Sequence, residues 1–120
     1  MSNAYSQYKM DVCELNELKW FCFQYEKKKK IIRNTENKTE KIALTRDIEA
    51  IDSTFDLLAE DEMIIELLKK SVTNKNMPYE ALGGVPMGRR QFYELRRRFF
   101  FLLQRIRRLA VVWEKLNDDN

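Results

Sequence analysis

The chain has 120 residues, of which 44% are hydrophobic and 34% charged, with a formal net charge of +3. This length suits one domain, and the composition allows it to bury a core and stay soluble. Histidine is absent, which removes the most common general base and metal ligand and argues against an enzyme, a metal site or a bound cofactor. Glycine and proline are scarce while Lys, Arg, Glu and Leu are abundant, so we expect an all-α protein.

Cysteine usage and hydropathy indicate the cellular compartment in which the protein is expected. Cys13 and Cys22 are the two thiols of the chain, too few for a zinc site without histidine. We expect them to be reduced and part-buried, as in a cytosolic protein, with one disulfide as the alternative. The sequence contains no recognisable signal peptide and no apolar run long enough to span a bilayer. We therefore expect a cytoplasmic protein without a membrane partner.

The first predicted helix runs from Tyr5 to about Arg33. Trp20, Phe21 and Phe23 widen its apolar stripe, so we expect this helix to touch more than one neighbour. The basic run Lys27–Lys30 is either a solvated helix end or an auxiliary phosphate contact. The apolar residues that recur at steps of three and four are Tyr5, Tyr8, Val12, Leu15, Leu18, Cys22 and Tyr25.

Two further helices are predicted before residue 74. The polar segment Asn34–Thr39 is a linker, and Thr39 is a candidate N-cap for the next helix. That helix carries an apolar seam of the bundle type, formed by Leu44, Ile48, Ile51, Phe55 and Leu58. The acidic cluster Glu60–Glu62 favours the start of a third helix. The side of this helix that we expect to be buried consists of Met63, Ile64, Leu67, Leu68 and Val72.

All three glycines and both prolines of the chain lie between Pro78 and Gly88. A short helix that starts at Pro78 is expected to stop at Gly83–Gly84, where positive φ is tolerated. Val85 is pushed into an extended conformation by the following proline and forms a turn. A long helix is then predicted from Gly88 to about Leu116. A short helix, a glycine turn and a basic helix form the layout of a helix-turn-helix.

The long helix is predicted to have an apolar and a basic side. The apolar side consists of Phe92, Leu95, Phe99, Leu102, Leu103, Ile106, Ala110 and Trp113. The opposite side carries Arg90, Arg97 and Arg108, flanked by Arg98 and Arg105. From Gly88 to Arg108 there are eight arginines and one acid, Glu94, which gives a local net charge of +7. An anionic partner is expected, and double-stranded DNA is the first candidate.

The start of the long helix is the predicted base-reading segment. The N-terminal end of a recognition helix enters the major groove, where arginine pairs with guanine and glutamine with adenine. Later arginines are expected to hold backbone phosphates, as is a lysine before the short helix. The predicted DNA-contacting residues are Arg89, Arg90, Gln91, Tyr93, Glu94, Arg96, Arg97, Arg98 and Lys75.

Residues 48–108 resemble the C-terminal half of small phage-encoded transcriptional regulators of the ArpU and RinA type. The matching pieces are IEAIDSTFDLLAEDEMIIELL, MPYEAL and VPMGRRQFYELRRRFFFLL. In that family the first piece leads into a helix-turn-helix similar to region 4 of sigma factors. The second piece is its supporting helix, and the third is its recognition helix. The resemblance implies DNA contacts at Arg89, Arg90, Gln91, Tyr93 and Arg97.

The chain departs from this family pattern at three places. Gly88 stands where the family usually has Ser or Thr as the N-cap of the recognition helix. The turn from Ala81 to Phe92 is one residue longer than the commonest helix-turn-helix spacing. Lys69–Val72 replaces an aromatic and acidic segment.

The expected architecture is one compact helical bundle. Residues 1–60 supply two long N-terminal helices, and residues 61–120 supply a helix-turn-helix unit with an extended last helix. The expected function is sequence-specific DNA binding in phage or prophage transcription control. A phage small terminase subunit and a helical protein–protein adaptor without DNA binding are the alternatives. A contact with RNA polymerase would combine DNA binding with the binding of a protein partner. Phe101 within the basic side, together with the aromatic stripe of the first helix, suggests a homodimer.

Overall fold

The computed structural model describes residues 9–118, with side chains for residues 9–109. Within this part of the chain all regular structure is helical, which confirms the prediction of an all-α protein. The elements are α1 (Val12–Phe23), α2 (Tyr25–Asn34), α3 (Lys38–Leu58), α4 (Glu62–Thr73), the 3-10 helix η2 (Tyr79–Leu82) and α5 (Arg89–Asp118).

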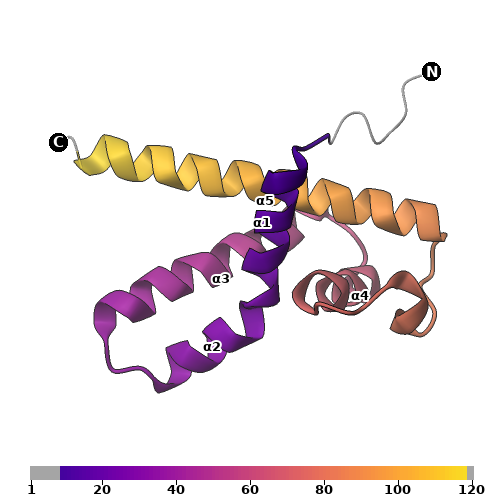
Figure 1. The fold of residues 1–120 in the computed structure, drawn as a ribbon, viewed down its shortest axis with the longest axis horizontal. Coiled ribbons are helices and arrows are strands. Elements are labelled where there is room, and N and C mark those ends of the chain that lie inside the picture. Colours follow the sequence, from indigo (N-terminus) through magenta and orange to yellow (C-terminus); the bar gives the residue numbers. More distant parts are fainter. Residues whose placement is uncertain (1–8, 119–120) are drawn as a thin grey trace.

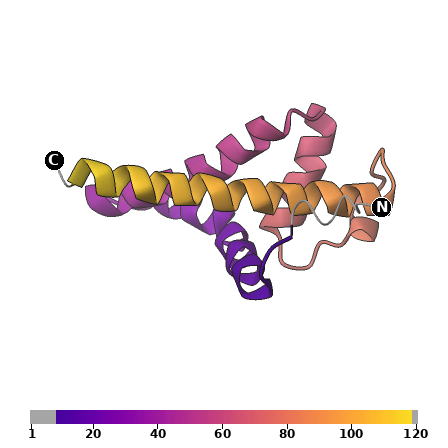
Figure 2. The same cartoon turned by 90° about the horizontal axis from the view of Figure 1, so that it is seen from above.

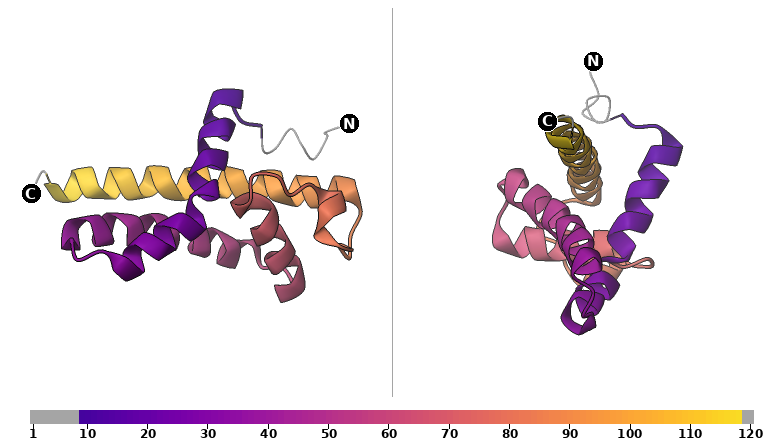
Figure 3. Two further views of the ribbon diagram at one scale, coloured as in Figure 1. Left: turned by 60° about the horizontal axis from the view of Figure 1, so that its bottom comes forward. Right: turned by 90° about the vertical axis from the view of Figure 1, so that its left-hand side faces the viewer.

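The other helices are arranged along α5, which has 30 residues and is the longest of the described elements. The α2–α3 hairpin lies below the C-terminal half of α5, and α4 and η2 lie below its N-terminal half (Figure 1). Seen from above, α1 and the connection between α3 and α4 lie on opposite sides of α5 (Figure 2). The end-on view in Figure 3 again places α1 beside α5 and the α2–α3 hairpin beneath it. One flank of α5 is therefore covered by α1.

The hydrophobic core joins the first and the second half of the chain. Phe55 of α3 stacks on Phe99 of α5, with ring centroids 4.5 Å apart. The predicted apolar face of α5 is confirmed for Phe92, Leu95, Phe99 and Leu103, all of which are buried. Each such side chain contributes about 1.5–3 kcal/mol when it is fully buried. Ala110 and Trp113, the last two members of the predicted face, lie outside the described side chains.

The prediction of one helix from Tyr5 to about Arg33 is wrong. Two helices, α1 and α2, meet at Gln24, which has φ −89° and ψ 2°. Tertiary contacts explain the bend, because Tyr25 Oη donates a hydrogen bond to Asp52 at 2.7 Å and so ties α2 to α3. The N-terminal part of the predicted helix, up to residue 8, lies outside the described residues.

One lysine of the basic run Lys27–Lys30 has a structural role that the sequence did not indicate. Lys28 is 8% exposed, and its ammonium lies 3.0 Å from an Asp47 carboxylate oxygen. The same ammonium lies 4.2 Å from the centroid of the Phe21 ring. Lys28 is therefore neither a solvated helix end nor a phosphate contact. It links α2 to α1 and α3.

The boundaries of α3 and α4 follow from their caps. The N-cap of α3 is Asn37 and not Thr39, since the Asn37 side chain accepts a hydrogen bond from the Glu40 N–H at 3.0 Å. The Asp61 carboxylate caps α4 in the same way, as the acidic cluster indicated. Met63 is 59% exposed, so its predicted burial is wrong. It lies roughly 140° around α4 from the fully buried residue 68, on the outer side of the helix.

The glycine turn has the predicted backbone conformation. Gly83 and Gly84 have φ 77° and 103°, so positive φ is confirmed at both positions. The short helix before them is a single 3-10 turn, and Pro78 is its N-cap rather than its first residue. Tyr79 Oη donates to the Met87 carbonyl at 2.7 Å and closes the turn. The last helix then begins one residue after Gly88.

Candidate nucleic-acid interface

The first turn of α5 is tied to the segment that precedes it. Arg89 Nε donates to a Glu80 carboxylate oxygen at 2.8 Å, and the pKa of Glu80 is lowered by a backbone hydrogen bond and by this contact with Arg89. Gln91 Oε1 accepts a hydrogen bond from the Gly88 N–H at 3.3 Å. This is the reciprocal half of a capping box, which compensates in part for the side-chain cap that Gly88 lacks.

The predicted base-reading arginines nevertheless remain on the surface. The Arg89 side chain is 64% exposed and that of Arg90 is 75% exposed. Arg90 lies 3.9 Å from a carboxylate oxygen of Glu94, one helical turn further on. Exposed pairs of this kind contribute about 0–1 kcal/mol. A phosphate or a base edge can therefore displace these carboxylates at little cost.

Tyr93, a predicted contact, is a positioning residue of the turn. Its hydroxyl accepts a hydrogen bond from the Tyr79 N–H at 3.2 Å, and the Arg89 guanidinium lies 5.0 Å from the centroid of its ring. The Tyr79 ring in turn packs against Phe92, with centroids 5.7 Å apart. These contacts join η2 to the start of α5 and set the direction in which the helix leaves the turn.

Two of the eight arginines of α5 pack inward rather than outward. Arg96 Nε donates to Ser71 Oγ of α4 at 3.0 Å, and its guanidinium lies 5.0 Å from the Phe100 ring centroid. Burial lowers the pKa of Arg96 from its ordinary value. The Arg107 guanidinium lies 4.0 Å from the centroid of the Phe21 ring of α1. Arg96, which was predicted to hold a phosphate, instead bridges α5 to α4.

A set of five arginines points away from the core, and we call it the outer arginine face. Its members are Arg90, Arg97, Arg98, Arg105 and Arg108, of which Arg97 and Arg98 are half-buried and the other three are exposed. Two carboxylates lie against it, since Glu94 is near Arg90 and Glu14 of α1 pairs with Arg108 at 2.9 Å. The five arginines outnumber the carboxylates described beside them, so the face carries an excess of positive charge. The outer arginine face therefore attracts anions.

Phe101 lies within the outer arginine face and is half-buried. The Arg105 guanidinium lies 4.8 Å from the centroid of its ring. This contact covers part of the ring, so Phe101 is not an isolated exposed aromatic residue. It also holds the Arg105 guanidinium close to the helix surface.

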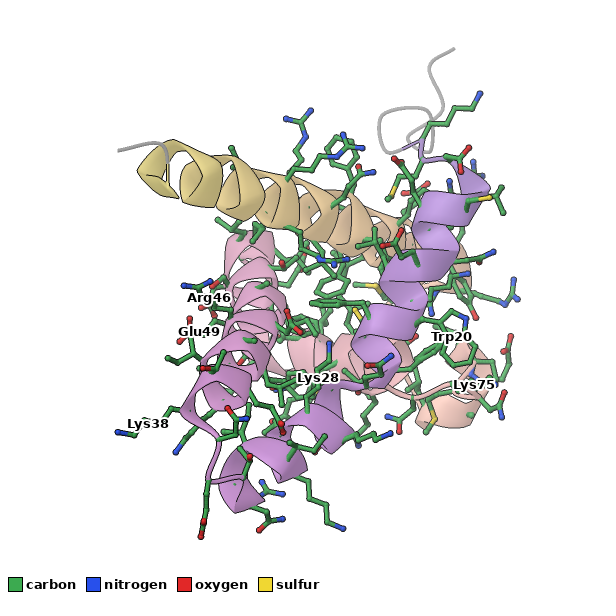
Figure 4. The ribbon with its side chains drawn as sticks, turned by 60° about the vertical axis from the view of Figure 1, so that its left-hand side comes forward. Trp20, Lys28, Lys38, Arg46, Glu49 and Lys75 are labelled. Carbon is green, nitrogen blue, oxygen red and sulfur yellow. The ribbon has the colours of Figure 1, made fainter. Side chains whose placement is uncertain are left out.

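Positive charge extends from α5 onto α1. The pKa of Lys19 is lowered by burial and by the positive charges of Arg96 and Arg97. Lys75, a predicted phosphate contact, lies on the same side of the molecule, with its ammonium 4.7 Å from the ring centroid of Trp20 (Figure 4). Lys19 and Trp20 were not predicted as site residues. The signal that could have identified them is the position of Trp20 beside the apolar stripe of its helix.

The cysteines differ in exposure. Cys22 is fully buried, and burial raises the pKa of its thiol to about 12. Cys13 is exposed, which corrects the prediction that it is part-buried. Both thiols are free. In the described part of the chain, no three side chains among the His, Cys, Asp and Glu residues gather into a group able to hold a metal ion.

The described helices also differ from membrane-spanning ones in hydropathy. None of them combines the length and the apolar character that crossing a membrane requires.

Comparisons of the chain with protein-family models, with curated proteins and with solved structures each found no match. The resemblance to regulators of the ArpU and RinA type therefore stays a prediction from the residues that carry it.

Proposed function

We propose that the protein binds duplex DNA through α5 and acts as a sequence-specific transcriptional regulator of the phage or prophage type that its sequence resembles. The observation that supports this most is the outer arginine face. Five arginines on one side of one helix, three of them exposed and two half-buried, would provide the electrostatic term that dominates affinity for DNA. A second basic helix, α2, also carries four unburied cations, Lys27, Lys29, Lys30 and Arg33, but among the described helices it is α5 that follows the glycine turn.

In this proposal the first turn of α5 and its later turns have different roles. Arg89 and Arg90 stand in the first turn of α5, where a helix in the major groove meets base edges. Both side chains are more than half exposed, and their carboxylate partners are exchangeable. Arg97, Arg98 and Arg105 lie two or more turns later, where the helix runs out toward the phosphate backbone.

The segment before α5 acts as the support of the recognition helix. In a helix-turn-helix this support is a short α-helix, whereas here it is the single 3-10 turn η2. The Tyr93–Tyr79 hydrogen bond and the Arg96–Ser71 hydrogen bond supply rigidity that so short a helix lacks. We include a homodimer in the proposal, because two recognition helices about 34 Å apart read a two-fold related site.

The test separates base reading from phosphate holding. A preferred duplex is first selected from a random pool with the parent protein, and Arg90→Ala and Arg105→Ala are then titrated against that duplex and a scrambled one. Loss of a bidentate arginine–guanine contact costs about 1–3 kcal/mol on the preferred duplex alone. Loss of a phosphate contact weakens both duplexes alike. We expect Arg90→Ala to lower the ratio of the two affinities and Arg105→Ala to leave it unchanged.

Two outcomes would contradict the proposal. If both variants weaken both duplexes equally, the first turn of α5 does not read bases. If neither variant changes DNA binding, the outer arginine face is not the DNA surface.

A further inference from the structure

A second surface lies beside the outer arginine face and is centred on α1. It combines aromatic and cationic side chains from three parts of the chain. Its members, which we call the Trp20 surface, are Lys19, Trp20 and Phe23 of α1, Arg97 of α5 and Lys75 of the segment after α4.

Trp20 is held in place but is not covered. The residue is 54% exposed. The Phe23 ring meets it edge-on, with centroids 6.0 Å apart and an interplanar angle of 79°. The Lys75 ammonium lies 4.7 Å from the indole centroid (Figure 4). Both contacts restrict the rotation of the indole and leave more than half of the residue open to a flat partner.

The charge around the indole is positive. Lys75 lies directly over the ring, and Lys19 precedes Trp20 in α1. The lowered pKa of Lys19 reflects its burial and the nearby charges of Arg96 and Arg97. One exposed acid, Glu17, lies on the same helix one turn before Trp20. The surroundings thus favour an anionic ligand that also presents an aromatic face.

Unpaired nucleotides have both properties. Bases stack on exposed aromatic side chains while basic side chains follow the phosphates, and this mode tolerates any sequence because every base has a flat face. The bases of a duplex are stacked on each other, so they do not offer a free face to an indole. Residues 90–108, which carry the outer arginine face, include no tryptophan, so the two surfaces suit different forms of nucleic acid.

We propose that the Trp20 surface binds an unpaired segment of nucleic acid, with one base stacked on Trp20 and the adjoining phosphates held by Lys19, Lys75 and Arg97. The two surfaces share Arg97, whereas Trp20, Lys19 and Lys75 lie outside the proposed duplex contacts of α5, so this site stands whether or not α5 reads a duplex. The shared chemistry is that of single-stranded DNA and single-stranded RNA.

The experiment uses the intrinsic fluorescence of the indole. The chain has two tryptophans, so Trp113→Phe leaves Trp20 as the single emitter and serves as the reference protein. Titration with a short oligothymidylate and with a matched oligouridylate should quench the emission as a base stacks on Trp20. The oligomer that binds more tightly identifies DNA or RNA as the source. We expect Trp20→Ala, measured by anisotropy of a labelled oligomer, to weaken binding about five- to 150-fold.

Matched variants separate stacking from general attraction to anions. Trp20→Phe keeps a flat ring and should retain most of the affinity. Lys75→Ala removes an exposed cation with little consequence for the fold and should weaken binding of the single-stranded oligomer. This variant keeps the test valid if a Trp20 variant fails to fold. Leu109→Ala, at another exposed apolar position, should change nothing.

The outcomes for the two proposals are distinguishable. If Trp20→Ala binds the oligomers as tightly as the parent, or if they leave the emission of the reference protein unchanged, the Trp20 surface does not bind unpaired bases. That result would instead favour a protein partner for the exposed aromatic side chains of this surface. If Trp20-dependent quenching is observed while duplex DNA does not bind, the role proposed for α5 fails and the present inference stands.

Discussion

Arg96 and Arg98 lie two residues apart on α5, yet the two arginines have different structural roles. The Arg96 guanidinium is hydrogen-bonded to Ser71 and packs against Phe100. Arg98 belongs to the outer arginine face and is half-buried like Arg96, but it makes no hydrogen bond to another helix among the described residues. A run of three arginines in a sequence is therefore not in itself a binding surface. The neighbouring helices decide which of them are available to a ligand.

Lysines show the same division. Lys28 and Lys75 both place an ammonium over an aromatic ring, at 4.2 Å and 4.7 Å from the ring centroid. Lys28 is also paired with Asp47 and is buried, so its charge is used inside the protein. Lys75 is exposed. A cation that stabilises an aromatic contact is available to an anionic ligand only when it also faces solvent.

The largest effect that tests this comparison is on stability. Arg96→Ala removes the partner of Ser71 Oγ and the packing on Phe100, so we expect it to lower the free energy of unfolding by about 2 kcal/mol. Arg98→Ala changes an unburied side chain and should stay within about 0.5 kcal/mol of the parent. Urea denaturation of both variants measures the difference. Equal losses would mean that the inward and outward arginines do not differ as described.

A smaller effect concerns the turn that sets where α5 begins. Gly83 has φ 77° and Gly84 has φ 103°, and a β-branched side chain is strained in this region. Gly83→Val and Gly84→Val should each destabilise the protein by about 1–2 kcal/mol.

The control for the turn is Gly83→Asn, because asparagine tolerates the left-handed conformation better than other side chains. It should lose less stability than Gly83→Val in the same denaturation experiment. If both valine variants unfold at the same urea concentration as the parent, the described backbone of the turn is wrong.

Part of the fold could be predicted because its signals are local. The glycine pair predicts positive φ because glycine adopts it without strain. The apolar period of the last helix identifies Phe92 as its first buried residue. The break at Gln24 has no such signal, since neither glycine nor proline marks it. It depends on contacts between Tyr25 and Asp52 and between Lys28 and Asp47, which are distant in sequence.

The candidate site was predictable to a similar extent. Helical periodicity separated the basic side of α5 from its apolar side, and the arginines of the outer arginine face are those that it grouped. Periodicity did not show that α1 covers one flank of α5, where Arg107 packs on Phe21. Nor did it show that Ser71 of α4 holds Arg96. Such packing depends on helix directions that become known only when the chain is folded.

The central claim is that the outer arginine face binds duplex DNA, and the salt dependence of binding tests it most directly. Anisotropy of a labelled duplex, titrated with the parent over a range of salt concentrations, should give a log–log slope of about −4 to −6, as expected for five or six phosphate contacts. Arg98→Ala and Arg107→Ala remove the same charge from the outer and the inner side of α5. We expect Arg98→Ala to make the slope shallower by about one unit and Arg107→Ala to leave it unchanged. A parent affinity that does not respond to salt, or equal changes of slope in the two variants, would contradict the claim.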